Sequence, residues 1–467
     1  MTTNSYDAVI VGAGPNGLTA AARLARAGRR VLVIEAAPTI GGGSRTLPFG
    51  KGSLYDPCAA VHPFGVSSPA FEELQLDQFG LTWLHPEIPL AHPLDDGSAA
   101  TLYRRADPNY DPSAAAHGRM WHAMIGYMSA DWDKWRCFAL TGVAESARTH
   151  PAQFARFGLF AALPITEAVL GFRSPKTRAL LMGLAAHAGG RLTSFGTTGV
   201  ALALAGAAEA KGMPIAQGGS QSIVNALANV ITQAGGEIET GRTISSLGDL
   251  PPSAAVLLDV TPSQAASIMG TKAPRWHHGV AAWKLDLVLS GPMPWTAPEC
   301  RRAGTVHLGG AWRDISRAES QTVRGLTPDN PFVIVAQPSL MDASRAPAGH
   351  HVIWAYRHVP NSYDAPDATV GIERQFDRFA PGWRDLVVHR QVTTALDYSR
   401  YNLSYVGGDI AGGAMTLKQT IARPRLAFDP YRTRQKGVWL CSQSTAPGPG
   451  VHGMCGWHAA GSVLRGG

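Results

Sequence analysis

The glycine-rich run GAGPNG, residues 12–17, constrains the fold of this chain more than any other feature. The apolar residues 8–11 before it are typical of a buried parallel strand, and an alanine-rich helical pattern follows. Glycines at the first two positions permit a tight turn, and the third lets the helix pack closely on the strand. Backbone N–H groups at the helix start then face a pyrophosphate. The pattern predicts a dinucleotide-binding unit.

A second apolar strand, residues 31–34, follows Gly28 and ends at Glu35. A carboxylate at this place hydrogen-bonds a ribose 2′-hydroxyl, which disfavours NADP and leaves FAD or NAD. The loop GGGSRT, residues 41–46, follows after a few residues and is expected to contact the same dinucleotide.

The remaining pattern predicts a second part interleaved with the first. The chain has 467 residues, enough for two domains, and no internal repeat or low-complexity linker separates them. Residues 89–105 are expected to form a hairpin that turns at Asp96-Gly97, helical patterns dominate residues 113–206, and strands prevail over residues 280–359. We expect an α/β fold in which a Rossmann-like domain (residues 1–60, 213–268 and 425–467) is interleaved with an α+β substrate domain of mixed sheet and helices (residues 61–212 and 269–424).

Charge and cysteine usage exclude several classes of partner. The net charge of +7 arises from 41 basic and 34 acidic residues without a basic block, so no nucleic acid is expected. The five cysteines show no zinc spacing, so no metal is expected, and they suit a reducing cytoplasm. No signal peptide is expected before the first strand. The apolar residues 157–172 are too short to span a bilayer. A cytoplasmic protein with at most peripheral membrane contact is the expectation.

The C-terminal segment GVWLCSQSTAPGPGVHGMCGWHAAGSVL, residues 437–464, favours FAD over NAD. It is predicted to form a strand, a proline-glycine turn and a helix that starts near Val451. Such a helix directs its positive end at a ligand, and the small residues Gly453, Cys455 and Gly456 allow a close approach. A reduced flavin carries negative charge around N1 and C2=O, which this helix would stabilise.

The opening unit, GGSQSI (residues 218–223) and PGPGVHGMCG (residues 447–456) occur in this order along the chain. In these motifs the chain resembles the FAD-dependent oxidoreductases of the phytoene desaturase and amine oxidase superfamily. GGDIAGGAMTLKQTIARP, residues 407–424, resembles its phytoene desaturase-like group, which includes the pyridine nucleotide-disulfide oxidoreductase domain-containing protein 2.

The resemblance implies bound FAD, with Arg45 near the phosphates, the Ile244 backbone at the adenine and the turn of residues 450–453 at the flavin. The residues that it assigns to the cofactor are Gly12, Gly14, Pro15, Asn16, Gly17, Glu35, Ala36, Gly42, Gly43, Ser44, Arg45, Ile244, Ser442, Gly450, Val451, His452, Gly453 and Met454.

Two departures from the group bear on the reaction. The chain has SQST at residues 442–445 where phytoene desaturases commonly show GAGT, which argues against a carotenoid substrate. GGAWRD, residues 309–314, lacks the spacing of a second dinucleotide unit, so a resident NAD(P)H domain is not expected. Electrons would then pass to oxygen, a quinone or another soluble acceptor.

We therefore expect an FAD enzyme that removes hydride from a C–H bond of a lipophilic organic substrate, as a desaturase or dehydrogenase does. A desaturase also needs an acceptor for the second proton, and the candidates are His452, as catalytic base, and Tyr405 and Asp409. His62 and His187 are candidates to face the substrate, and Lys284 is a candidate for a cation near the flavin. Each has the alternative role of a packed structural residue.

Lys284 lies in AAWKLDLVL, where alternation places it with Ala282 and Asp286 on one strand face. The strand resembles that of amine oxidases whose lysine holds a water against flavin N5. The pattern leaves two positions for Lys284: that polar site, or a surface or structural position.

Three other functions fit the same motifs. A flavin amine oxidase would oxidise a C–N bond, and a carotenoid-type isomerase would use reduced FAD without net oxidation. A binding protein of the same fold, like the Rab escort and dissociation-inhibitor proteins, would do no redox chemistry; the complete C-terminal flavin segment argues against it.

Overall fold

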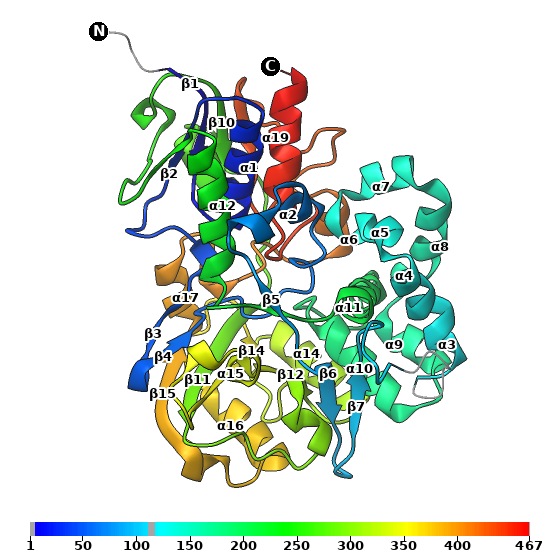
Figure 1. The fold of residues 1–467 in the computed structure, drawn as a ribbon. Helices are drawn as coiled ribbons and strands as arrows, with labels where there is room; N and C mark the ends of the chain where they lie inside the picture. The colour runs from blue at the N-terminus through cyan, green and yellow to red at the C-terminus, as the bar shows by residue number, and fades with distance from the viewer. Residues whose placement is uncertain (1–4, 111–116, 467) are drawn as a thin grey trace.

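The computed structural model describes residues 5–110 and 117–466, and its two large sheets come from alternating parts of the chain (Figure 1). The first is a five-stranded parallel sheet in the order β16-β10-β1-β2-β9. Its strands are β1 (Tyr6–Val11), β2 (Val31–Ile34), β9 (Glu237–Glu239), β10 (Ser253–Leu258) and β16 (Val438–Leu440). These strands lie within the three ranges expected for the Rossmann-like domain, whose exact boundaries stay a prediction.

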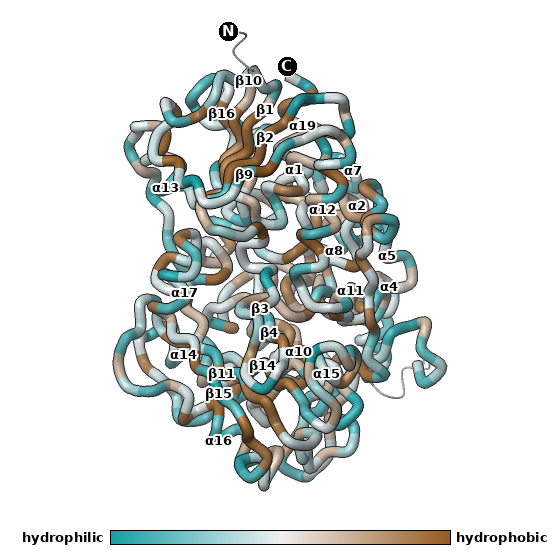
Figure 2. The backbone as a smooth tube through the Cα atoms, turned by 60° about the vertical axis from the view of Figure 1, so that its left-hand side comes forward, coloured by the Kyte–Doolittle hydropathy of each residue, from teal (hydrophilic) through white to brown (hydrophobic). Residues whose placement is uncertain are grey.

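Both faces of this sheet are covered, which explains the continuous apolar runs in its strands. One face packs on α1 (Pro15–Arg26), α12 (Gln221–Gln233) and α19 (Met454–Gly466), and the other on α13 (Pro262–Ile268). Figure 2 shows β1, β2 and β16 as a hydrophobic layer between these helices.

The second sheet has seven strands in the order β15-β11-β14-β13-β12-β6-β7 and is mixed, because β12 and β6 are parallel and the other neighbours antiparallel. Its strands are β6 (Ile88–Pro93), β7 (Ala99–Leu102), β11 (Ala281–Leu289), β12 (Ala303–Leu308), β13 (Val333–Ala336), β14 (His351–Val359) and β15 (Val387–Thr393). The expected hairpin is the β6–β7 pair, and the fold class predicted from the sequence is confirmed.

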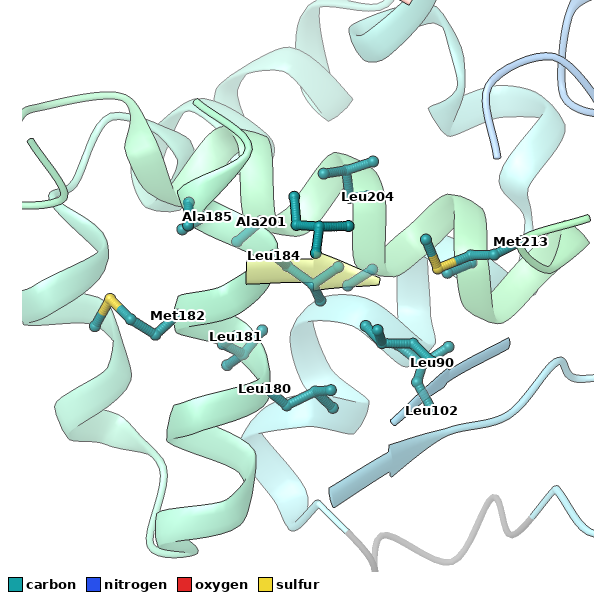
Figure 3. Packing of buried hydrophobic residues seen from close by; sticks show 14 of the residues in the cluster. Leu90, Leu102, Leu180, Leu181, Met182, Leu184, Ala185, Ala201, Leu204 and Met213 are labelled. Carbon is teal, nitrogen blue, oxygen red and sulfur yellow. The ribbon is translucent and has the colours of Figure 1, made fainter. Parts of the chain in front are cut away.

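Helices cover this sheet too. One face packs on α16 (Thr369–Phe379), and the other on α10 (Pro175–Ala186), α11 (Thr197–Lys211) and α14 (Trp312–Val323). Figure 3 shows leucines of α10 and α11 packed against Leu90 and Leu102 of the β6–β7 hairpin. The other α-helices and strands of the described residues are α2 (Pro69–Glu73), α3 (Arg119–Trp121), α4 (Tyr127–Ala130), α5 (Trp132–Trp135), α6 (Cys137–Leu140), α7 (Val143–Thr149), α8 (Pro151–Ala161), α9 (Ile165–Ala168), α15 (Pro338–Met341), α17 (Ala395–Tyr401), α18 (Leu417–Ile421), β3 (Leu47–Phe49), β4 (Ser53–Tyr55), β5 (Trp83–Leu84) and β8 (Ile215–Ala216).

The helices α3 to α11 gather at one side of the molecule, as expected for residues 113–206, although residues 113–116 lie outside the described part of the chain (Figure 1). Within residues 5–110 and 117–466, no single helix has the length and apolarity to cross a bilayer. Residues 151–161 and 165–171 reach that length only together, and the chain bends by 86° between them.

Candidate dinucleotide and substrate site

A cavity of about 1220 Å³ is lined by residues of both sheets and of the helical side. Sites for a single small ligand usually enclose about 300–1,000 Å³. This cavity is therefore large enough for a dinucleotide and part of a second molecule.

The glycine-rich loop between β1 and α1 forms one end of the cavity. Gly12, Gly14, Pro15 and Asn16 line it, and α1 begins at Pro15, so the Asn16 N–H is the donor that the start of this twelve-residue helix leaves for a ligand here. A Cβ on Gly17 would lie 2.1 Å from the Gly12 oxygen, so this glycine lets helix and loop touch but does not itself line the cavity. The loop has the shape that a pyrophosphate requires.

Glu35 lines the same end, directly after β2. Its carboxylate accepts hydrogen bonds from the backbone N–H groups of Ala13 at 2.8 Å and Ala37 at 2.9 Å. These bonds hold the carboxylate at the cavity wall, and each oxygen keeps acceptor capacity for a ribose hydroxyl. The neighbouring Ala36 and Ile244 line the cavity as well.

The second glycine-rich loop lies against the first. A Cβ on Gly42 would lie 3.2 Å from the Gly14 Cα, and Gly42, Gly43, Ser44 and Arg45 all line the cavity. The Arg45 guanidinium donates to backbone oxygens of Thr39 and Gly42 at 2.6 and 3.2 Å, so it also fixes the shape of its own loop. The buried Ser44 hydroxyl has no partner among the described residues and can donate to a phosphate.

The C-terminal segment differs from its expectation. Ser442, Gly450 and Val451 line the cavity, but His452, Gly453 and Met454 do not, and α19 starts at Met454, not near Val451. Gly453 has φ +69°, which a helix does not accommodate.

The small residues of this segment lie against other parts of the protein and not against the cavity. A Cβ on Gly453 would lie 2.2 Å from Thr19 Oγ1, and one on Gly456 would lie 1.8 Å from the Asn16 oxygen. They let α19 approach α1, so the expected close approach of Gly453 to the cofactor is corrected to a close approach to Thr19.

His452 is not placed as a catalytic base. Its side chain is 1% exposed, its Nδ1 accepts a hydrogen bond from the Met454 N–H at 3.0 Å, and burial lowers its pKa to about 4. The ring therefore caps the first turn of α19, which is the structural alternative to the predicted catalytic role.

Lys284 does not line the cavity either. Its Nζ donates to the Asp286 carboxylate and, at 3.0 Å, to the Asp56 backbone oxygen, and both Lys284 and Asp286 are fully enclosed. The lysine is neither on a solvated face nor at the cavity wall, so it lies where the structural alternative expects it, in an enclosed ion pair.

Tyr405, Asp409, His62 and His187 do line the cavity. Burial raises the pKa of the Tyr405 hydroxyl well above its ordinary value, so this group keeps its proton. Asp409 accepts from the Gly279 N–H at 3.0 Å, and His62 Nε2 lies 2.8 Å from the Ser220 hydroxyl. Burial lowers the pKa of His62 to about 4 and that of His187 to about 3, so both rings are neutral at pH 7.

Asp259 is a cavity residue that the sequence reasoning missed. It follows β10, and its Oδ2 accepts from the Gly17 N–H at 2.8 Å, between the glycine loop and the cavity. Burial, with a smaller contribution from Glu35, raises its pKa to about 7. Its position directly after a strand of the predicted Rossmann unit could have identified it, because ligands bind at the carboxyl ends of the strands in such sheets.

Comparison with known proteins gives the same assignment as the motifs. The model of the NAD(P)-binding Rossmann-like domain matches residues 10–74. Pyridine nucleotide-disulfide oxidoreductase domain-containing protein 2 of Rattus norvegicus is 26% identical over 98% of this chain and 93% of its own length. Hydroxyneurosporene desaturase of Cereibacter sphaeroides is 32% identical over 51% of this chain and 50% of its own.

Solved structures share the fold over the whole chain. Putrescine oxidase, in its complex with putrescine, has a TM-score of 0.60 at 16% identity and covers 99% of both chains. Cyclohexylamine oxidase from Brevibacterium oxydans has a TM-score of 0.59 at 13% identity, again over 99% of both chains.

These similarities confirm the resemblance that the motifs predicted. The chain is an oxidoreductase with a Rossmann-like dinucleotide-binding unit, similar over its whole length to pyridine nucleotide-disulfide oxidoreductase domain-containing protein 2 and built on the fold of the amine oxidases.

Proposed function

We propose that this protein is an FAD enzyme that removes hydride from a C–H bond of a lipophilic organic substrate, as a desaturase or dehydrogenase. The observation that carries the proposal is the continuity of the cavity, which extends from the glycine-rich loop to apolar walls of the helical side. A dinucleotide bound at the loop would place its far end in the same enclosed space as an apolar substrate.

The residues at the loop end fit the adenosine and pyrophosphate parts of FAD. The Asn16 N–H at the start of α1 and the unpartnered Ser44 hydroxyl offer donors to the phosphates, and Glu35 offers its carboxylate to the ribose. When bound, the flavin supplies the hydride acceptor. The chain's own residues would hold and orient it and exclude water; residues 449–451 line the cavity where the ring system would lie.

The walls beyond the loop end support a lipophilic substrate. Phe138, Phe154, Phe157, Val200 and Leu204 line this part of the cavity from α6, α8 and α11. Burying apolar surface against them favours binding by roughly 25 cal/mol per Å².

The mouth of the cavity supports entry of the substrate from a lipid surface. Leu403, Phe195, Leu417 and Ile421 line the cavity and are nevertheless exposed, by 69%, 65%, 43% and 46%. Exposed apolar residues in a group mark interaction surfaces. We propose that this group makes a peripheral contact with the cytoplasmic side of a membrane.

The double variant Phe195→Ser, Leu417→Ser tests this contact. It should co-sediment less with phosphatidylcholine vesicles than the unchanged protein does, and unchanged co-sedimentation would contradict the contact.

Amine oxidation is the second candidate, because putrescine oxidase and cyclohexylamine oxidase share the fold. The same fold also occurs in a Rab GDI from Plasmodium falciparum, with a TM-score of 0.50 at 10% identity. A shared fold therefore does not decide the reaction.

The deciding experiment is an anaerobic screen of the purified protein. Acid release and chromatography should yield FAD, and the flavin absorbance near ~450 nm should bleach with an isoprenoid or other lipid and recover with oxygen or a quinone. Bleaching by amines alone would favour amine oxidation, and absence of flavin after reconstitution with FAD would refute the proposal.

A further inference from the structure

Tyr405 places its hydroxyl group against the second glycine-rich loop, residues 41–46. It follows α17 in the chain, lines the cavity and is 7% exposed. A Cβ on Gly43 would lie 2.0 Å from the Tyr405 hydroxyl oxygen and 3.3 Å from Tyr405 Cζ. The hydroxyl group therefore occupies the space that a side chain at residue 43 would fill.

This position lies beside the loop that is shaped for a pyrophosphate. Gly42, the neighbour of Gly43, approaches the first glycine-rich loop, because a Cβ on Gly42 would lie 3.2 Å from the Gly14 Cα. Asp259, which is bonded to the same first loop, is near enough to influence Tyr405. Burial, and to a smaller extent charges that include the Asp259 carboxylate, raise the pKa of the Tyr405 hydroxyl well above its ordinary value. The hydroxyl thus lies at the dinucleotide end of the cavity and keeps its proton.

The proton of this hydroxyl has no strong acceptor inside the protein. Its hydrogen-bonding neighbour is the Cys58 thiol. Burial raises the pKa of that thiol to about 12, so the sulfur keeps its own proton, and a neutral thiol is a weak acceptor. Within residues 5–110 and 117–466, no nitrogen or oxygen atom accepts from the Tyr405 hydroxyl. A ligand oxygen would therefore find this donor available.

Two neighbouring tyrosines show the contrast. The Tyr401 hydroxyl donates to the Gly42 backbone oxygen at 2.9 Å. The Tyr398 hydroxyl donates to the Pro57 backbone oxygen at 3.0 Å. Both tyrosines also line the cavity, but each uses its hydroxyl proton to bond another part of the protein. Tyr405 lines the same cavity without such a bond, which is expected of a group that binds a ligand.

The charges at this end of the cavity make an uncharged donor important. A pyrophosphate is anionic, and the cavity residues Glu35 and Asp259 are acidic. The Arg45 guanidinium lies 3.7 Å from a Glu35 oxygen and donates to backbone oxygens of its own loop, so much of its charge is already compensated. Hydrogen bonds to an ionised acceptor are about twice as strong as those between neutral groups. A hydroxyl donor at this place therefore helps to hold the pyrophosphate without adding a charge.

We propose that Tyr405 is a dinucleotide-binding residue, whose hydroxyl donates a hydrogen bond to the pyrophosphate of the cofactor. This assignment replaces the role in proton transfer for which the sequence made Tyr405 a candidate. It rests on the proposed function in taking the dinucleotide to be FAD.

Tyr405→Phe is the direct test, because it removes the hydroxyl and keeps the ring. The Kd of the apo-protein for FAD, measured by quenching of flavin fluorescence, should rise about tenfold, which corresponds to about 1.4 kcal/mol. The Tm of the apo-protein should stay the same, because the hydroxyl makes no strong bond to the described protein. A Kd equal to that of the unchanged protein would overturn the proposal.

Tyr398→Phe is the matched control. It removes a hydroxyl from a second buried tyrosine of the cavity wall, whose ring centroid lies 6.2 Å from that of Tyr405. This variant loses its bond to the Pro57 backbone oxygen and should show a lower Tm, with the Kd for FAD unchanged. An equal rise of the Kd in both variants would show that any change in this wall weakens FAD, and it would overturn the specific role of Tyr405.

Two fragments of FAD locate the contact. ADP carries a pyrophosphate without the flavin, and riboflavin carries the flavin without a phosphate. In calorimetric titrations of the apo-protein, Tyr405→Phe should weaken binding of ADP by the same factor as binding of FAD and leave binding of riboflavin unchanged. A loss for FAD and riboflavin without a loss for ADP would place the hydroxyl at the flavin and overturn the proposal.

The outcomes separate this inference from the proposed function. If the unchanged protein binds FAD and is bleached by a lipid, but Tyr405→Phe has the same Kd, the inference alone is refuted. If Tyr405→Phe weakens binding of both FAD and ADP, but no lipid bleaches the flavin of the unchanged protein, the proposed function alone is refuted.

Discussion

Lys284 and Asp286 form an ion pair on one face of β11, and neither side chain is exposed to solvent. Burial lowers the pKa of the lysine and raises that of the aspartate to about 6, so the pair persists because each charge compensates the other. The pair supports the sheet beneath the cavity and does not reach the cavity wall.

Lys284→Met should therefore destabilise the protein by about 3–5 kcal/mol, because it leaves the Asp286 carboxylate buried without a partner. Denaturant unfolding measures the change, and the double variant Lys284→Met, Asp286→Leu should recover most of it. Unchanged stability together with slower reoxidation of the reduced enzyme would instead support the cation beside the flavin that the sequence suggested.

Gly456→Ala should destabilise the contact between α19 and α1, because its Cβ would lie 1.8 Å from the Asn16 oxygen. Overpacking of this kind costs about 1–3 kcal/mol. Gly158→Ala in α8 is the control: its Cβ meets nothing within 4 Å, so the variant should gain about 0.5–1 kcal/mol of helix stability. Equal Tm values for the two variants would contradict the close packing of α19 on α1.

Asp259 should make dinucleotide binding depend on pH. The folded protein keeps this proton up to about pH 7, whereas the unfolded chain loses it near pH 4, so the stability that the group contributes falls as pH rises between these values. The ionised carboxylate also repels a pyrophosphate. The Kd of apo-protein for FAD should therefore rise about tenfold from about pH 6 to about pH 8.

Asp259→Asn keeps an acceptor for the Gly17 N–H and removes the charge. The variant should bind FAD with the same Kd at both pH values, measured by quenching of flavin fluorescence. A wild-type Kd that does not change with pH would show that Asp259 does not face the phosphates.

Glu35→Ala should weaken binding of the dinucleotide by roughly 1.5–3 kcal/mol, the contribution of a hydrogen bond to a charged group. Glu237→Ala on the neighbouring strand β9 is the control, because that carboxylate is exposed and outside the cavity. If the Kd for FAD is the same in both variants, Glu35 does not contact the ribose.

The features that were predicted best are those that depend on residues close together in the sequence. The glycine turn, the two strands around it, the second glycine loop and the placement of Glu35 at the cavity are local, and the resemblance added Ile244 and Ser442. That Thr305, Tyr356 and His358 line one wall of the cavity was not predictable, because strand alternation alone does not specify the pairing of β12, β13 and β14.

The errors at the C-terminal end have a single physical reason. A run of small residues shows that a helix approaches something closely, but it does not say what. Here the neighbour is α1. The positive φ of Gly453 interrupts the helical backbone, and the His452 ring caps the N–H of Met454, so α19 begins beyond the cavity wall.

The strand order of the five-stranded sheet has a consequence for biosynthesis. β1 pairs with β10, and β10 with β16, so strands from residues 6–11, 253–258 and 438–440 must meet before the sheet is complete. Contacts between such distant segments form slowly, and partly folded intermediates expose apolar surface. On the ribosome, the glycine loop emerges long before residues 438–440 complete its sheet, so a nascent chain stalled before residue 438 should expose apolar surface and be a target for chaperones.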